Sequence, residues 1–167
     1  MRPLMTIAAA LVLCMATAPV SKAADRNSTS SGNYEVMSIG TGTPGTKILK
    51  VYVTDRNKKN APALARKAAV EACLFRGIPA GGRVAATPAL CSISAEKEHA
   101  DFFGKFFAEG GQYLRYVNLT SEGAIPDEDI IKVKGGYKVG VIVQVMYDNL
   151  RRDLQDAGII RSLGSGF

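Results

Sequence analysis

Apolar and polar side chains alternate along residues 47–54. Leu49, Val51 and Val53 fall on one side of this segment and Lys50 on the other, so we predict a strand with one buried face. Residues 34–39 form a second predicted strand. The glycine-rich residues between the two, 40–45, are typical of a turn. The folded region should therefore begin with a β-hairpin.

Residues 40–45 also match the dinucleotide-binding pattern GxGxxG. In a nucleotide site a helix follows the glycines, and amide groups at its N-terminus hold the pyrophosphate. Here a β-branched and aromatic run follows instead, and Pro44 lies inside the motif. We therefore predict a hairpin turn at this point and no cofactor.

A helical periodicity replaces the alternation in the middle of the chain. The first predicted helix has Asn60 as its capping residue and Pro62 in its first turn, and it ends at Gly77. Its small-residue face is expected to pack closely on the sheet and consists of Ala65, Ala68, Ala69 and Ala72. The second predicted helix runs from Ser94 to Glu109. One arc of this helix, the Phe stripe, consists of His99, Phe102, Phe103, Phe106 and Phe107.

The remaining sequence predicts strands followed by a short helix. Strands are expected over 112–119, 130–134 and 137–147, and Gly135-Gly136 indicates a hairpin between the last two. The final strand is apolar on both faces and is therefore expected at the centre of the sheet. Asp148 is the predicted cap of a helix that ends at Gly158. The order ββααβββα predicts an α+β fold, a mostly antiparallel sheet with helices packed on it, in one domain over 34–158 with a tail at 159–167.

The N-terminus has the pattern of a secretory signal peptide. Arg2 supplies a positive charge, an apolar stretch follows, and Ser21-Lys22-Ala23 offers small residues at the cleavage positions. Residues 1–23 are therefore predicted to be removed, and the polar residues 24–33 to form a flexible leader. The alternatives are a membrane anchor, for which the apolar run is short, and a lipoprotein, for which Leu13 before Cys14 is unsuitable. We expect an exported protein of the periplasm, the cell envelope or the extracellular space, with no membrane span after cleavage.

Charge limits the class of partner. Loss of Arg2 and Lys22 lowers the formal net charge from +6 to +4, and the remaining excess is spread along the chain. Nucleic-acid-binding proteins instead concentrate basic residues on one face, together with aromatic platforms. We therefore exclude nucleic acid and expect a protein partner in the envelope.

Cys73 and Cys91 remain after cleavage, an even number in an oxidising compartment. A disulfide between them would stabilise the fold by about 3 kcal/mol through loop closure. The alternative is two buried free thiols, and the sequence leaves both interpretations open. No CxxC motif or histidine pair accompanies the cysteines, so neither a metal site nor thiol–disulfide catalysis is predicted.

The chain offers little material for catalysis. His99 is its one histidine, so the ExxH spacing with Glu96 lacks the second motif that a carboxylate-bridged metal site needs. No serine lies in a GxSxG context, and the acidic run 127–129 lacks the ligand spacing of a calcium loop. The Phe stripe has two interpretations. It packs against the sheet or the neighbouring helix, or it forms an interaction face that His99 makes sensitive to pH.

Several segments together resemble a known family, and they read YEVMSIG, EHADFFGKFFAEGGQYLRYVNL, YKVGVIVQVMYDNLRRDL and AGIIRSLGSGF. They look like small exported α+β proteins of Gram-negative bacteria with no assigned function. More loosely, the strands and the alanine-rich helix are similar to the α+β domains of envelope lipoproteins and flagellar-assembly proteins. Neither resemblance implies catalytic residues.

These features together predict an exported, non-catalytic binding or assembly module that needs no cofactor. Two other functions stay open, an exported hydrolase whose carboxylates meet only in the fold and a small-ligand carrier. A deep pocket with convergent carboxylates would favour the hydrolase, whereas a flat apolar patch would favour the binding module.

Overall fold

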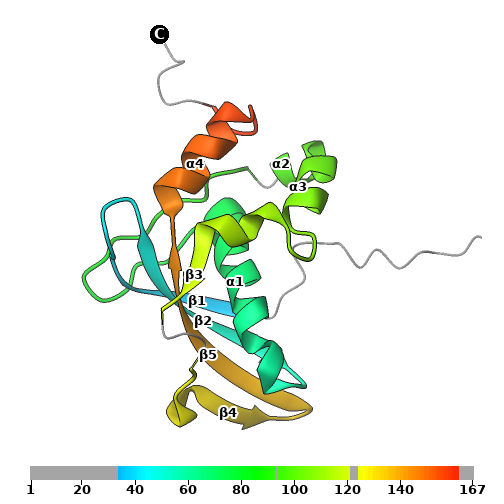
Figure 1. Cartoon of the computed structure of the whole chain (residues 1–167). Helices are drawn as coiled ribbons and strands as arrows, with labels where there is room; N and C mark the ends of the chain where they lie inside the picture. The colour runs from blue at the N-terminus through cyan, green and yellow to red at the C-terminus, as the bar shows by residue number, and fades with distance from the viewer. Residues whose placement is uncertain (1–33, 93, 121–123, 162–167) are drawn as a thin grey trace, which may run out of the picture.

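The computed structural model describes residues 34–92, 94–120 and 124–161. In this part of the chain a five-stranded antiparallel sheet is combined with helices α1 (Ala61–Glu71), α2 (Ala95–Glu98), α3 (Ala100–Phe106) and α4 (Tyr147–Asp156). Figure 1 shows α1 lying across the sheet and α4 continuing beyond the end of β5 (Gly136–Val145). The predicted α+β class is confirmed. The predicted signal peptide, the leader and the last residues of the tail lie outside the described residues.

Strand β5 lies at the centre of the sheet, as predicted from its apolar character on both faces. One edge of β5 pairs with β2 (Lys47–Asp55), which in turn pairs with the edge strand β1 (Tyr34–Gly40). The other edge of β5 is shared by β3 (Val117–Leu119) at one end and β4 (Ile130–Val133) at the other. Both predicted hairpins, β1–β2 and β4–β5, are present, and residues 41–46 connect the first pair rather than leading into a helix.

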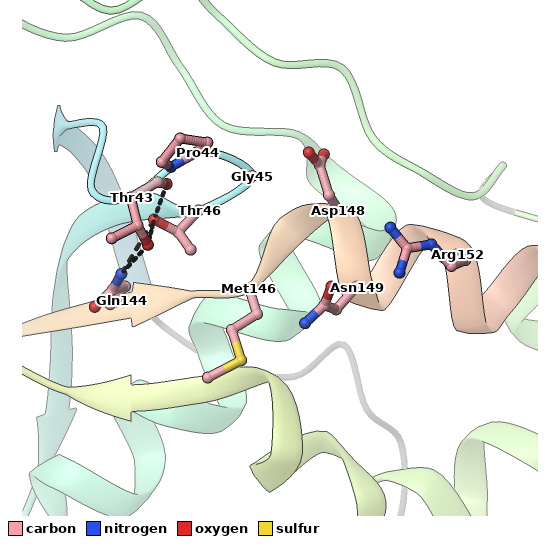
Figure 2. Close-up of a pocket in the computed structure, with 9 residues that line it drawn as sticks. All are labelled: Thr43, Pro44, Gly45, Thr46, Gln144, Met146, Asp148, Asn149 and Arg152. Atoms are coloured by element: carbon pink, nitrogen blue, oxygen red, sulfur yellow. Dashed lines mark hydrogen bonds between the residues drawn. The ribbon is translucent and has the colours of Figure 1, made fainter.

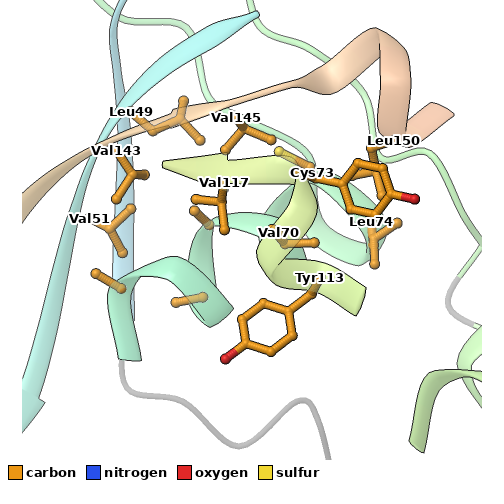
Figure 3. Close-up of a cluster of buried hydrophobic side chains, with 14 of the residues drawn as sticks. Leu49, Val51, Val70, Cys73, Leu74, Tyr113, Val117, Val143, Val145 and Leu150 are labelled. Carbon is orange, nitrogen blue, oxygen red and sulfur yellow. The ribbon is translucent and has the colours of Figure 1, made fainter. Parts of the chain in front are cut away.

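The core lies between α1 and one face of the sheet. The predicted small-residue face of α1 is buried there, because alanines let the helix backbone approach β2 and β5 closely. Facing this helix, the two central strands contribute Leu49, Val51, Val143 and Val145, all fully buried. Figure 3 shows these side chains together with Val70, Leu74 and Val117 in one cluster.

The predicted continuous helix from Ser94 to Glu109 is wrong. It is divided into α2 and α3 at His99, whose φ of −116° and ψ of 36° lie outside the helical region. Ala95 of α2 and Phe103 of α3, on either side of this break, are both buried in the core.

The predicted strand over 112–119 is shorter than expected. Residues Gln112–Tyr116 form a 3₁₀ helix, and pairing with β5 begins only at Val117. Tyr113 and Tyr116 are both buried. A strand would place two side chains three residues apart on opposite faces, whereas a three-residue helical turn places both on one face.

The predicted N-terminal caps also differ from the observed ones. Asn60 does not cap α1, and its side chain donates a hydrogen bond to Asp55 Oδ1 at 3.1 Å. At α2 the first amide donates to Ser92 Oγ rather than to Ser94. Asp148 lies inside the first turn of α4, which begins one residue earlier. The predicted C-terminal cap is present, since Gly158 has a φ of 71° and the next amide bonds back to α4.

Candidate functional site

The Phe stripe lies mainly in the core. Phe103, Phe106 and Phe107 are buried, while Phe102 and His99 are partly exposed. Edge-to-face contacts join Phe103 to Phe75 of the π-helical turn Ala72–Arg76, with ring centroids 5.0 Å apart. The three buried rings therefore cannot form an exposed interaction face.

Cys73 and Cys91 are buried free thiols in the structure, the second of the two alternatives that the sequence left open. They lie on adjacent segments, because the Leu90 amide donates to the Cys73 carbonyl and the Cys91 amide to the Leu74 carbonyl. Burial raises the pKa of Cys73 to about 12 and that of Cys91 to about 11. Both thiols are therefore protonated at neutral pH and are poor nucleophiles.

A shallow groove lies between the β1–β2 turn and the start of α4. Its volume is about 440 Å³, and Figure 2 shows its lining residues, Thr43, Pro44, Gly45, Thr46, Gln144, Met146, Asp148, Asn149 and Arg152. The turn side is rigid. Thr46 Oγ1 donates to the Thr43 carbonyl at 2.7 Å, and Gln144 Nε2 donates to Thr46 Oγ1 at 3.1 Å.

Gly45 fixes how the turn meets α4. It has a φ of 81°, and a Cβ at this position would meet the Asp148 carboxylate at 2.9 Å. The Asp148 amide donates to the Gly45 carbonyl at 3.0 Å, which ties the first turn of α4 to the hairpin. Asp148 is the one carboxylate that lines the groove, so the groove has no pair of acids for hydrolysis. Its amides, hydroxyls and single arginine suit hydrogen bonding to a small polar molecule.

The second candidate surface is the face of the sheet opposite α1, which we call the open sheet face. The register places Glu35, Met37, Tyr52, Lys50 and Ile142 on it, because the alternate residues Val36, Val51 and Val141 face the core. Ile131 of β4 pairs with Lys138 of β5 and belongs to the same face. Met37 and Ile131 are each 50% exposed, so this face presents large apolar side chains to solvent.

The charges of the open sheet face are paired. Lys50 forms an ion pair with Asp129, and Lys138 pairs with Glu35 at 2.9 Å. The hydrogen bond to Asp129 raises the pKa of Lys50. Both ammonium groups also flank the Tyr52 ring, at 5.5 and 5.3 Å from its centroid. The face is therefore a mixture of apolar side chains and neutralised ion pairs.

Tyr52 lies flat across the open sheet face because Gly140 leaves space for it. A Cβ at Gly140 would stand 2.8 Å from the Tyr52 ring. Gly140 pairs directly with Tyr52 in the β2–β5 register, so the ring covers the backbone of the central strand. An aromatic side chain held in this way offers a rigid contact surface at low entropic cost.

A polar cluster around the buried Glu71 lies on the other side of β1. Glu71, at the end of α1, is 4% exposed, and it accepts a hydrogen bond from the Tyr34 hydroxyl at 3.1 Å. Burial raises the pKa of Glu71 to about 7 and also raises that of Tyr34. The Arg76 guanidinium stacks over the Tyr34 ring, 4.3 Å from its centroid.

Sequence reasoning missed the open sheet face and the Glu71 cluster. The alternation of Glu35, Met37 and Ile39 with Val36 and Ser38 is visible in the sequence, but it does not tell which set α1 covers. The hydrogen-bond partner of Glu71, Tyr34, is 37 residues away in the chain, and no local signal connects the two.

Two further findings concern the described residues. They contain no group of three or more histidine, cysteine or acidic side chains placed to hold a metal ion. None of the helices in this part of the chain has the length and apolar character needed to cross a membrane.

Comparison of the chain with protein-family models, with curated proteins and with solved structures finds no match.

Proposed function

We propose that this chain is an exported cell-envelope protein that acts as a non-catalytic binding or assembly module through its open sheet face. The observation that carries the proposal is the exposure of Met37 and Ile131 on one face, each at 50%. Single exposed apolar residues are ordinary in soluble proteins. Here Tyr52 and Ile142 lie on the two strands between them, so apolar side chains extend across one face of the sheet, as they do on contact surfaces.

The paired charges favour a protein partner. A nucleic-acid site needs free cations to replace the counterions of the phosphates. On the open sheet face Lys50 and Lys138 are already neutralised by Asp129 and Glu35. A protein surface with its own apolar residues and matching polar groups fits such a face better, because interfaces combine an apolar centre with a polar rim.

The test uses charge substitutions on two sides of the molecule. In the native host, the double variant Met37→Glu with Ile131→Glu is compared with Leu64→Glu, which changes a 38% exposed leucine on α1. Envelope extracts are separated by native electrophoresis. We expect wild type and Leu64→Glu to migrate as part of a larger complex and the double variant to migrate at the mass of the free chain. A complex of unchanged size in the double variant, or none in wild type, would contradict the proposal.

A small-ligand carrier is the second candidate, and the groove beside the β1–β2 turn supports it. Within the described residues, Asp148, Asn149 and Arg152 line this groove and their side chains form no hydrogen bond or ion pair with another residue. A screen of small polar compounds by thermal shift tests this role. A rise in Tm that Arg152→Ala abolishes is the expected result for a carrier.

A further inference from the structure

Glu71 occupies an unusual place for a carboxyl group. It lies at the C-terminal end of α1 and is 4% exposed, within the layer between the helix and β1. Buried carboxylates are ordinarily held by a cation or by several hydrogen bonds. Within the described residues Glu71 has no ion-pair partner, and its side chain receives one hydrogen bond, from Tyr34 Oη at 3.1 Å.

The charged and titratable groups around Glu71 come from all the elements packed against it. Tyr34 faces it from β1, Arg76 from the π-helical turn, Lys67 from α1 itself and Glu96 from α2. Arg76 and Lys67 favour the ionised carboxylate, while Glu96 and burial oppose it. In this structure Arg76 does not form an ion pair with Glu71, because its guanidinium is stacked on the Tyr34 ring.

Burial makes ionisation costly in the closed arrangement, and it outweighs the Tyr34 hydrogen bond, Arg76 and Lys67, which all favour the carboxylate. A neutral carboxyl fits the buried position and accepts the Tyr34 hydrogen bond. An ionised carboxylate must either draw Arg76 off the Tyr34 ring or reach water, and both changes disturb the contact between Tyr34 and the end of α1. We propose that Glu71 is a pH-sensitive latch that holds the start of β1 against the helical layer when protonated and releases it when ionised.

Strand β1 is suited to such a release. It is an edge strand that pairs with β2 on one side only. Among the described residues, the Tyr34–Glu71 hydrogen bond is the one side-chain hydrogen bond that joins β1 to the helical layer. Ser38 does not add a second, since its hydroxyl is buried without a partner. Loss of the latch would therefore loosen the start of β1 while β2 and β5 remain paired.

The latch also bears on binding, and this part rests on the function proposed above. Met37 on the open sheet face belongs to the strand that the latch holds. Loosening of β1 would lower affinity for a partner that contacts Met37. The latch itself is a property of the isolated protein and is tested without any partner.

Amide hydrogen exchange of β1 tests the latch. Protection factors, corrected for the pH dependence of intrinsic exchange, are measured on the mature protein between about pH 4 and pH 8. The carboxyl pKa is raised from 4.5 to about 7 in the closed state, so opening should become easier as pH rises through this interval and level off above it. We expect protection of the first β1 amides to fall roughly tenfold per pH unit, about three hundredfold in all. Amides of β5 should keep a larger protection.

Matched variants separate the latch from general effects of pH. Glu71→Gln keeps the size of the side chain and an acceptor for Tyr34 but cannot ionise, so β1 should stay protected across the whole range. Glu35→Gln on the same strand, exposed and paired with Lys138, should behave as wild type. Tyr34→Phe removes the hydrogen bond that joins β1 to Glu71, so its first β1 amides should be less protected than those of wild type at every pH.

Two results would overturn the latch. One is β1 protection in wild type that does not change with pH, and the other is an unchanged pH dependence in Glu71→Gln. Failure of the binding proposal gives a different pattern. The protection of β1 would still change with pH as expected, but the double variant Met37→Glu with Ile131→Glu would leave the envelope complex intact.

Discussion

Truncation of Phe103 to alanine should remove the centre of the aromatic cluster between α3 and α1. The ring is 1% exposed. It makes edge-to-face contacts with Phe75, Phe102 and Phe106, at centroid distances of 5.0, 5.2 and 6.4 Å. Phe102 and Phe106 belong to α3, and Phe75 belongs to the π-helical turn that follows α1. The Phe103 side chain therefore packs α3 against the end of the first helix.

The expected cost follows from burial and from these contacts. Phe→Ala substitutions at buried sites cost about 3–5 kcal/mol through lost transfer free energy and the cavity left behind. Aromatic pairs add about 0.5–1.5 kcal/mol each beyond area burial. Because Phe103 is among the largest fully buried side chains and touches three rings, we expect a loss in the upper part of the first range.

Urea unfolding of Phe103→Ala and Phe102→Ala measures this difference. Phe102 is only partly buried, so its truncation should cost clearly less. A midpoint for Phe103→Ala equal to that of wild type would refute the core assignment of the Phe stripe and return it to the role of an interaction face. The m-value reports the surface exposed on unfolding, so equal m-values in the two variants and wild type show that their free energies of unfolding can be compared directly.

Three further predictions concern single groups. Folded Glu71 has a pKa of about 7 against 4.5 when exposed, so the folded state binds the extra proton between these values and stability falls as pH rises through them. Urea titrations measure the free energy of unfolding, and that of Glu71→Gln should rise by about 3 kcal/mol relative to wild type from the low to the high end of that interval. A difference between the two proteins that does not change with pH would contradict the raised pKa of Glu71. Gly140→Ala should lose about 1–3 kcal/mol by thermal melting because its Cβ meets the Tyr52 ring at 2.8 Å, and an unchanged Tm would be evidence against this packing. In a chain that lacks the predicted signal peptide, Cys73 and Cys91 should react with a thiol reagent only after denaturation, whereas absence of reaction in urea would show a disulfide.

The sheet was predictable from the sequence because each strand carries its own signal. Alternation marks β2, two-sided apolar character marks β5 as central, and small residues mark the buried face of α1. Local capping was less predictable. The side chain of Ser92 rather than that of Ser94 accepts from the α2 backbone, since several polar residues near a helix start can take that role and tertiary packing selects one.

Features that depend on long-range packing were not predictable. The break at His99 is one such feature, since the helical periodicity of residues 94–109 shows no interruption there. Alternation predicts the buried side of β2, but the side of β1 that joins the open sheet face is set by its register with β2. The Tyr34–Glu71 contact likewise forms only when β1 is placed beside α1.

The most direct test of the proposed function places a photo-reactive amino acid at single positions in the native host. One variant carries it at Met37 on the open sheet face, and the control carries it at Leu64 on α1, which is also exposed. After irradiation of intact cells, we expect one discrete adduct of higher mass from position 37 and none from position 64. No adduct at position 37, or the same adducts from both positions, would contradict the claim that this chain works through the open sheet face.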